Sequence, residues 1–130
     1  MSFSSDLAKF IEKAGKNRDT VIRKVALQLQ SSMVERSPVD TGRFRGNWQC
    51  GIGQANTGTG SGEDKSGSAV LLRTTSALQG WTAGQAILLT NSLPYAQRLE
   101  HGHSAQAPHG MVRLTVNEFQ DEVRKAVSEL

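Results

Sequence analysis

Residues 53–67, in the middle of the chain, limit what the rest of it can fold into. This stretch has almost no apolar residue and is rich in glycine, serine and threonine. It cannot bury enough apolar surface to fold alone, so it predicts a long mobile loop. In an oligomer, such a loop could become ordered against a neighbouring subunit. A phosphate-binding loop is not supported, because no Gly-Lys-Ser/Thr sequence follows and no helix starts at the required point.

The composition predicts one small domain that spans residues 1–130. A hydrophobic fraction of 37% and 13 glycines indicate that part of the chain is loop. The net charge of +3 is mild and the charges are interspersed, which gives only weak support for nucleic-acid binding. The single cysteine, Cys50, excludes an internal disulfide framework and fits a reducing compartment. We interpret it as a small, half-buried apolar residue.

We expect no targeting or membrane segment in this sequence. Met1-Ser2-Phe3-Ser4-Ser5-Asp6 lacks a basic region followed by an apolar one, so we expect no secretory signal peptide. No apolar run approaches the roughly 20 residues that span a bilayer. We therefore expect a protein that is made and kept in the cytosol of its producing cell, without a membrane partner.

Apolar residues at three- and four-residue spacing predict helices in four places. The middle helix covers Ser68–Gln79 and stops at Gly80, although the apolar run 70–72 leaves a strand possible. The long second helix ends before Pro38, because a residue that precedes proline disfavours helical geometry. In each of the other three predicted helices the apolar residues form a stripe along one face. The stripe of the first helix is Leu7, Phe10, Ile11 and Ala14, and that of the second is Ile22, Val25, Ala26, Leu29 and Met33. The stripe of the last helix, which starts from Met111, is Val112, Val116, Phe119, Val123, Val127 and Leu130.

Two strands and a turn are predicted between these helices. Residues 37–42 form the turn, in which Asp40 can bond to following amides and Gly42 can take a positive φ. Apolar positions alternate from Phe44 to Ile52, which predicts a half-buried strand with Phe44 and Trp48 facing the core. Arg43 and Arg45 would then lie on the other face of the strand from the aromatic rings. This arrangement does not support the stacking of nucleic-acid bases on those rings. The run 85–90 predicts a second strand, covered on both faces or placed at a subunit contact.

Residues 91–110 predict a joint that leads from this strand to the last helix. Pro94 suits a first helical turn, and Asn91 or Ser92 can cap that helix. Gly102 stands where a helix commonly stops in the left-handed conformation. An extended linker with Pro108 follows.

Three histidines in this joint, His101, His103 and His109, invite a metal-site interpretation. Their spacing matches no familiar zinc pattern, and His101 and His103 can chelate together only if the chain is extended there. Ser104 with His109, or Asp40 with His101, could be drawn as nucleophile pairs, but no nucleophile motif surrounds them. Paired carboxylates for acid–base work are not evident. We therefore expect no metal site, no cofactor and no enzymatic activity.

Three segments together resemble the tail-completion or neck proteins of long-tailed bacteriophages, the family that includes minor tail protein Z–like chains. The resemblance covers roughly residues 21–127, with the glycine-rich loop as its variable part, and three motifs in this order are fairly specific. The first segment is Ser37-Pro38-Val39-Asp40-Thr41-Gly42-Arg43-Phe44-Arg45-Gly46-Asn47-Trp48. The second is Leu89-Thr90-Asn91-Ser92-Leu93-Pro94-Tyr95-Ala96 with Leu99-Glu100-His101-Gly102, and the third is Gln106-Ala107-Pro108-His109-Gly110-Met111-Val112-Arg113.

The resemblance implies an α+β fold, with a small antiparallel sheet packed against a long N-terminal helix, a short middle helix and a C-terminal helix. It implies a non-enzymatic virion protein at the head–tail junction, assembled in the host cytoplasm. Its partners would be further copies of itself in a ring around the DNA channel, a tail terminator or tail tube protein, and a head connector or adaptor. Alternatives are a tail terminator or head-closure protein and, from another class, a small DNA-binding module.

The same resemblance assigns structural or assembly roles to single residues. Tyr95 and Leu99 would pin the short helix to the sheet, Glu100 and Gly102 would shape its exit, and Pro108 would aim the last helix. The full set of motif residues is Asp40, Thr41, Gly42, Phe44, Trp48, Asn91, Pro94, Tyr95, Glu100, Gly102 and Pro108.

Overall fold

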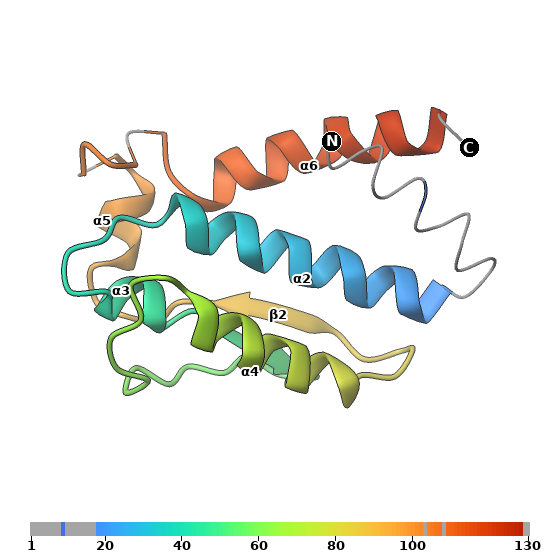
Figure 1. Cartoon of the computed structure of the whole chain (residues 1–130), viewed down its shortest axis with the longest axis horizontal. Helices are drawn as coiled ribbons and strands as arrows, with labels where there is room; N and C mark the ends of the chain where they lie inside the picture. The colour runs from blue at the N-terminus through green and yellow to red at the C-terminus, as the bar shows by residue number, and fades with distance from the viewer. Residues whose placement is uncertain (1–8, 10–17, 103, 108, 129–130) are drawn as a thin grey trace.

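The computed structural model describes residue 9 and residues 18–102, 104–107 and 109–128, and side chains only up to residue 121 and not at residue 18. The first predicted helix, around Leu7–Ala14, lies outside these residues except for Lys9. Five helices and two strands occupy the described ranges (Figure 1). In chain order they are α2 (Arg18–Arg36), α3 (Arg43–Gly46), β1 (Gln49–Ile52), α4 (Ser68–Gln79), β2 (Ile87–Thr90), α5 (Ala96–Glu100) and α6 (Val112–Ser128).

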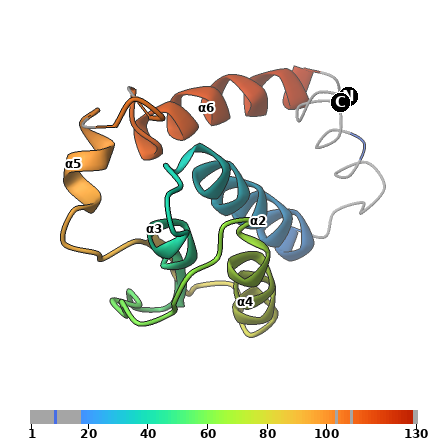
Figure 2. The same cartoon turned by 60° about the vertical axis from the view of Figure 1, so that its left-hand side comes forward.

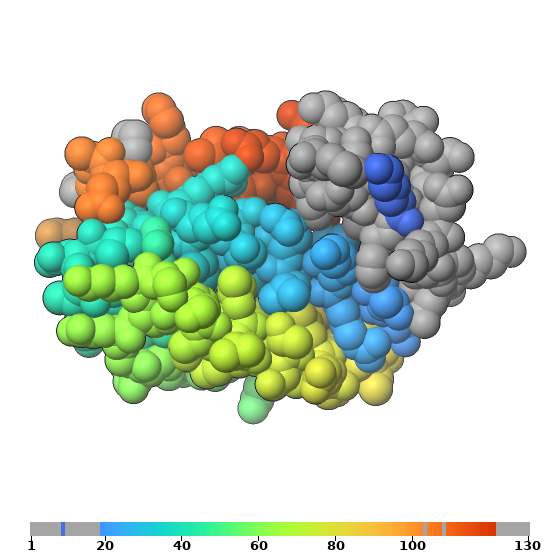
Figure 3. Space-filling view, in the orientation of Figure 1, coloured from blue at the N-terminus to red at the C-terminus, as the bar shows by residue number. Residues whose placement is uncertain are grey.

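The long helix α2 is the middle layer of the molecule. It contacts α6 on one side and α4 on the other, and α4 in turn packs on β1. On the face shown in Figure 3, side chains of α2 remain visible between those of α4 and α6. This arrangement confirms the expected α+β fold with a small antiparallel sheet. No helix in the described ranges is long and apolar enough to cross a membrane.

The buried face of α2 differs from the predicted stripe. Ala26 and Met33 are buried as expected, but Ile22 is 40% exposed and Gln30 is completely buried. The Gln30 amide donates to the Gln49 carbonyl and to the Thr74 hydroxyl, both at 3.3 Å, which satisfies its donor in the interior. Because α2 packs against layers on two sides, its buried surface does not follow a single apolar stripe. The helix ends at Arg36, before Pro38, as predicted.

The two strands pair antiparallel in a regular register. Gln49 lies opposite Thr90, and Ile52 lies opposite Ile87. The strand expected at 85–90 is confirmed over Ile87–Thr90, although its residues are half-buried rather than covered on both faces. The strand expected from Phe44 is wrong in its first half, because residues 43–46 form the one-turn helix α3 and β1 starts only at Gln49.

The spacing of Phe44 and Trp48 explains that error. The two residues are four positions apart, which is two periods of a strand and about one turn of a helix. Either structure would therefore put both rings on the same side. The rings meet edge to face, with centroids 6.0 Å apart. Asn47 and Gln49, which strict alternation would place at the surface, are buried. Asn47 donates to the Arg43 carbonyl at 2.7 Å and accepts the Ser61 amide at 3.1 Å.

No helix or strand occurs between Ile52 and Ser68, and the mobility of this loop stays a prediction. Its last part lies against the first motif segment: the Asp64 amide donates to the Gly42 carbonyl at 2.9 Å. A Cβ atom on Gly42, which has φ +89°, would lie 2.6 Å from the Lys65 nitrogen. Only glycine fits there, because the backbone is left-handed and the loop approaches closely.

Asp64 also holds the start of α4, the helix predicted over Ser68–Gln79. Its carboxylate accepts the amides of Gly67 and Val70, both at 3.1 Å. We expect Asp64→Ala to lower the free energy of unfolding by about 1–2 kcal/mol, because the first turn of α4 loses its anionic acceptor. Urea denaturation measures this change, and the exposed neighbour Glu63→Ala is the control, with an expected change within about 0.5 kcal/mol. Equal losses in both variants would contradict this role of Asp64.

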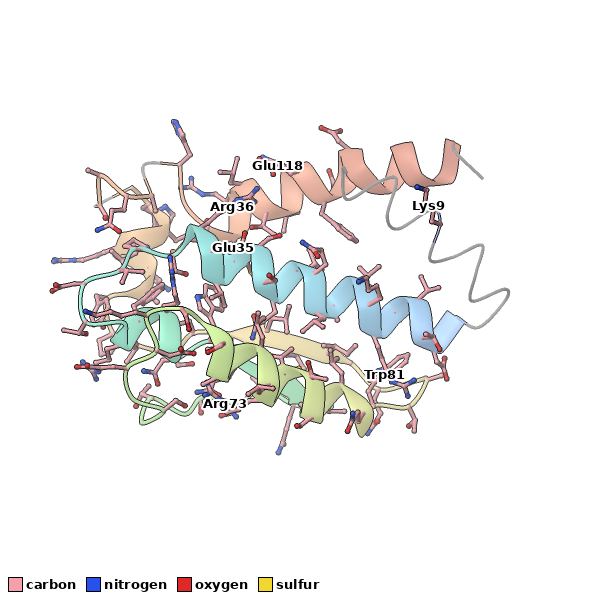
Figure 4. All side chains as sticks on the ribbon, in the orientation of Figure 1. Lys9, Glu35, Arg36, Arg73, Trp81 and Glu118 are labelled. Atoms are coloured by element: carbon pink, nitrogen blue, oxygen red, sulfur yellow. The ribbon has the colours of Figure 1, made fainter. Side chains whose placement is uncertain are left out.

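The C-terminal helix α6 forms where predicted but turns a different face inward. Met111 and Thr115 are buried, whereas Val112 and Val116, two members of the predicted stripe, are 40% and 44% exposed. Arg36 of α2 bonds to this inward face: it donates to the Thr115 hydroxyl at 2.8 Å and pairs with Glu118. Figure 4 shows Arg36 and Glu118 close together between the two helices.

Candidate assembly site

The three segments that carry the family resemblance meet at one end of the molecule. In Figure 1 this is the end where α2 stops, α3 and α5 lie, and α6 begins, and Figure 2 brings it forward. One core cluster joins the segments; its buried members are Met33, Val34, Phe44, Trp48, Val70, Leu93, Ala107 and Met111. Segments that are far apart in sequence therefore form one continuous structure here.

The turn after α2 is held by Ser37 rather than by Asp40. The Ser37 hydroxyl donates to the Met33 carbonyl and accepts the Trp48 indole N–H, both at 2.7 Å. Asp40 is exposed, and its expected bonds to following amides do not occur with any described residue. The Thr41 hydroxyl accepts the Arg43 amide at 3.2 Å instead and so supports the start of α3. The positive φ expected at Gly42 is confirmed.

Asn91 ties the second segment to the first, which corrects its expected role as a helix cap. Its side-chain amide donates to the Phe44 carbonyl at 2.8 Å, and its oxygen accepts the Leu93 amide at 3.3 Å. Tyr95 occupies the N-cap position of α5 without a side-chain capping bond, so exposed Pro94 precedes the helix rather than opening its first turn. Asn91 is therefore a bridge between β2 and α3.

Tyr95 packs on the aromatic pair of the first segment. Its ring centroid lies 5.8 Å from that of Phe44, at an angle of 40°. The expected role of Tyr95 was to pin the short helix to the sheet. Its ring instead pins the start of α5 to α3. Leu99 packs against the same core cluster one turn later. Gly102 ends α5 with φ +86°, as predicted.

Glu100, the last residue of α5, holds the start of α6. Its Oε1 accepts the amides of Met111 and Val112, both at 2.8 Å, and its Oε2 accepts the Arg113 amide at 2.9 Å. The Arg113 guanidinium adds a bond to Oε2 at 3.1 Å. One carboxylate thus occupies the positive end of a helix that begins twelve residues later.

Burial and hydrogen bonding act on the pKa of Glu100 in opposite directions. Burial of the carboxyl raises its pKa, but the three amides and the Arg113 side chain together outweigh this, so the net pKa is lowered from 4.5. Gly110 makes room for the contact, because a Cβ atom there would lie 2.5 Å from the Glu100 carbonyl oxygen. The backbone at Gly110 is also left-handed, with φ +83°.

The third segment joins the first through Gln106, a residue that the sequence did not single out. Its side-chain oxygen accepts the Val39 amide at 2.9 Å, and its nitrogen donates to the Val39 carbonyl at 3.2 Å. The amide thereby satisfies both backbone groups of Val39 as a neighbouring strand would. Ala107 beside it is buried in the core. Pro108 lies outside the described residues.

These contacts surround an open groove of about 300 Å³, which we call the turn groove. Its walls are the turn 38–44 and side chains from α5 and the linker. Asp40, Thr41 and Arg43 are exposed along it. The groove combines charged, hydroxyl and aromatic side chains on a well-braced frame, which suits a protein contact.

The groups that suggested other chemistry form no metal-ligand cluster among the described residues. His101 and His109 are exposed, and His103 lies outside the described residues. Within the part of the chain that is described, no three His, Cys, Asp or Glu side chains cluster as metal ligands. Cys50 is half-buried, and burial raises the pKa of its thiol, which disfavours the reactive thiolate.

Most described arginines bond to the protein itself. Arg23 donates to the carbonyls of Leu78 and Trp81, and Arg73 donates to those of Gly46 and Trp48. The carbonyls of Glu35, Ser37 and Lys65 accept from Arg45. Arg36 and Arg113 pair with carboxylates. These guanidinium groups are engaged in the fold, which leaves few of them to bind DNA phosphates.

A scan against protein-family models, a search of curated proteins and a search of solved structures each found no match for this chain.

Proposed function

We propose that this chain is a non-enzymatic structural protein of a bacteriophage virion. It acts at the head–tail junction, where it completes the tail tube and joins it to the head connector as an oligomeric ring. The proposal rests on the resemblance of the three segments to tail-completion proteins. One structural observation supports it most: residues of all three segments line the turn groove at one end of the molecule, and only Ser104 of its lining lies outside them.

The bonds between the segments are specific and reach across long stretches of sequence. Asn91 reaches the Phe44 carbonyl across 47 positions, and Gln106 reaches Val39 across 67. Side-chain amides that meet backbone groups so far away fix the shape of this end of the molecule. A fixed surface is what a joining protein needs, because a preformed contact loses less conformational entropy when partners bind.

Deletion of the gene from the phage genome that carries it is expected to give heads and tails that remain unjoined. Electron microscopy of the lysate would show this, and a plasmid copy of the gene should restore joined particles. Normal joined particles after deletion would contradict the proposal. Salt-dependent binding of the purified protein to duplex DNA near physiological salt would instead favour a DNA-binding module.

Complementation with charge-reversed variants tests the turn groove itself. Arg43→Glu changes an exposed residue that lines the groove, and we expect it to restore fewer than about one in ten particles, as loss of about 1.4 kcal/mol at a contact would. Arg98→Glu on α5 is the matched control, because Arg98 is also exposed but does not line the groove. Equal restoration by both variants would show that the groove is not the joining surface.

A further inference from the structure

The positive charge of the chain is concentrated in one stretch of the sequence. Between Asp64 and Glu118 the only carboxylate side chain is that of Glu100. The basic residues of this stretch are Lys65, Arg73, Arg98 and Arg113. They give it a net charge of +3 without its histidines, which equals the net charge of the whole chain. The rest of the sequence is therefore balanced, and the excess of positive charge belongs to residues 65–117.

Two of these basic residues are engaged or offset close to where they stand. The Arg73 guanidinium donates to two backbone carbonyls of the fold, at 2.8 and 3.2 Å. Lys65 directly follows two acidic residues in the sequence, so its charge is offset there. Arg98 of α5 and Arg113 of α6 remain. Both belong to the joint between these two helices, which Figure 2 shows at one side of the molecule.

The one carboxylate of the joint is turned inward, whereas its two guanidinium groups reach the surface. The Glu100 carboxylate accepts three amides at the start of α6, and its side chain is 18% exposed. Arg113 pairs with this carboxylate, but 55% of its side chain stays exposed. Arg98 is exposed and forms no hydrogen bond or ion pair with any described residue. The surface of the joint is therefore positive.

Two exposed histidines adjoin these arginines. His101 stands three positions after Arg98 at the end of α5, a spacing that puts both on one side of a helical turn. His109 directly precedes Gly110, where a Cβ atom would lie 2.5 Å from the Glu100 carbonyl oxygen, so it stands next to the end of α5. Arg113 donates to the same carbonyl. We call the four side chains the basic face: Arg98, His101, His109 and Arg113.

We propose that the basic face contacts the phosphate backbone of duplex DNA without reading its sequence. Guanidinium forks and imidazole N–H groups are donors that match phosphate oxygens. Helix α5 has only five residues, too few to lie along a groove and read base edges. A protein partner fits less well, because the four side chains supply no apolar anchor and none of them lines the turn groove. The contact goes beyond the joining role and requires only the free protein.

Fluorescence anisotropy with a labelled duplex of about 20 base pairs tests the contact. Two or three phosphate contacts predict a dissociation constant of roughly 10–100 μM at about 20 mM salt, and one weaker than about 1 mM near 150 mM. Arg98→Gln should weaken binding at low salt about threefold to tenfold and reduce the slope of log K against log salt by about 1. Lys24→Gln, an equal loss of charge at an exposed position of α2, is the control and should leave both nearly unchanged. No binding at about 20 mM salt, or equal effects of the two variants, would overturn the proposal.

Two further measurements locate the contact and identify its ligand. Addition of the duplex should shift the backbone amide NMR signals of residues 97–102 and 109–113 most, and the largest shifts elsewhere would refute the basic face. Poly-L-glutamate at equal charge concentration should compete at least about threefold less well, because duplex DNA has the higher charge density. Equal competition would show that an acidic polypeptide suits the face as well and would remove the assignment to DNA. These outcomes concern the free protein, so they are separable from the gene-deletion result.

Discussion

Trp48→Ala is expected to lower the free energy of unfolding by about 3–5 kcal/mol, the usual cost of truncating a large buried aromatic residue. Trp48 is 3% exposed and belongs to the core cluster where the three motif segments meet. The change removes the edge-to-face contact with Phe44 and the indole bond to the Ser37 hydroxyl. A cavity would then open between α2, α3 and α6. Urea denaturation followed by circular dichroism measures the loss.

Two further variants separate the contributions to that loss. Trp48→Phe keeps an aromatic ring but removes the donor to Ser37, so we expect a smaller loss of about 1–3 kcal/mol from the smaller ring and the lost bond. Leu72→Ala, at a position that is 71% exposed, should change stability by less than about 0.5 kcal/mol. A Trp48→Ala protein as stable as the Leu72→Ala protein would show that this end of the molecule is not packed as described.

Glu100→Ala is expected to cost about 2–4 kcal/mol, because a single carboxylate accepts three backbone amides and a guanidinium at the start of α6. Its side chain is only 18% exposed, so water cannot fully replace these bonds. Glu100→Gln keeps one acceptor oxygen and should lose about half as much. Far-ultraviolet circular dichroism should show reduced helix content, and hydrogen exchange should be fastest at residues 111–113. Glu63→Gln serves as the exposed control. Unchanged protection at 111–113 in Glu100→Ala would disprove the capping role.

The same carboxylate makes stability depend on pH in a defined direction. The pKa of Glu100 is lower in the folded protein than its ordinary value of 4.5, so the folded state favours the ionised form. Its contribution is fully present above pH 4.5 and is lost as the pH falls through the folded pKa. Glu100→Gln should therefore flatten the acid side of the stability profile and leave the neutral region parallel to the wild type. An acid profile as steep as that of the wild type would argue against ionised Glu100 as the cap.

Local patterns in the sequence predicted the elements whose environment is simple. Helix α4 follows its periodicity and stops at Gly80, and α2 ends ahead of Pro38, because these limits depend only on neighbouring residues. The α3 error arose because the spacing of Phe44 and Trp48 satisfies helix and strand alike. The face that α6 turns inward meets Arg36, a residue on another helix. No periodicity within one segment carries that information.

The candidate site was predictable in its location but not in its bonds. The motif residues Phe44, Trp48, Asn91, Tyr95 and Glu100 do gather with their neighbours in one part of the fold. The partner of Glu100 is a helix start ten or more positions away, outside the spacing of any local capping motif. Gln106 bonds to Val39 across 67 positions and carries no local signal at all. Such long-range bonds follow from the tertiary fold.

The shared carboxylate has a consequence for how the molecule opens. Since the last residue of α5 caps the first residues of α6, neither helix end can open without releasing the other. The two helix ends therefore form one cooperative unit, which Asn91 and Gln106 fasten to α3 and to the turn after α2. Local opening of this unit would remove the side of the turn groove that Tyr95, Leu99 and Gln106 form, while the turn 38–44, α2 and α4 stay folded. The surface that we assign to assembly is thus complete only while α5 and α6 hold each other.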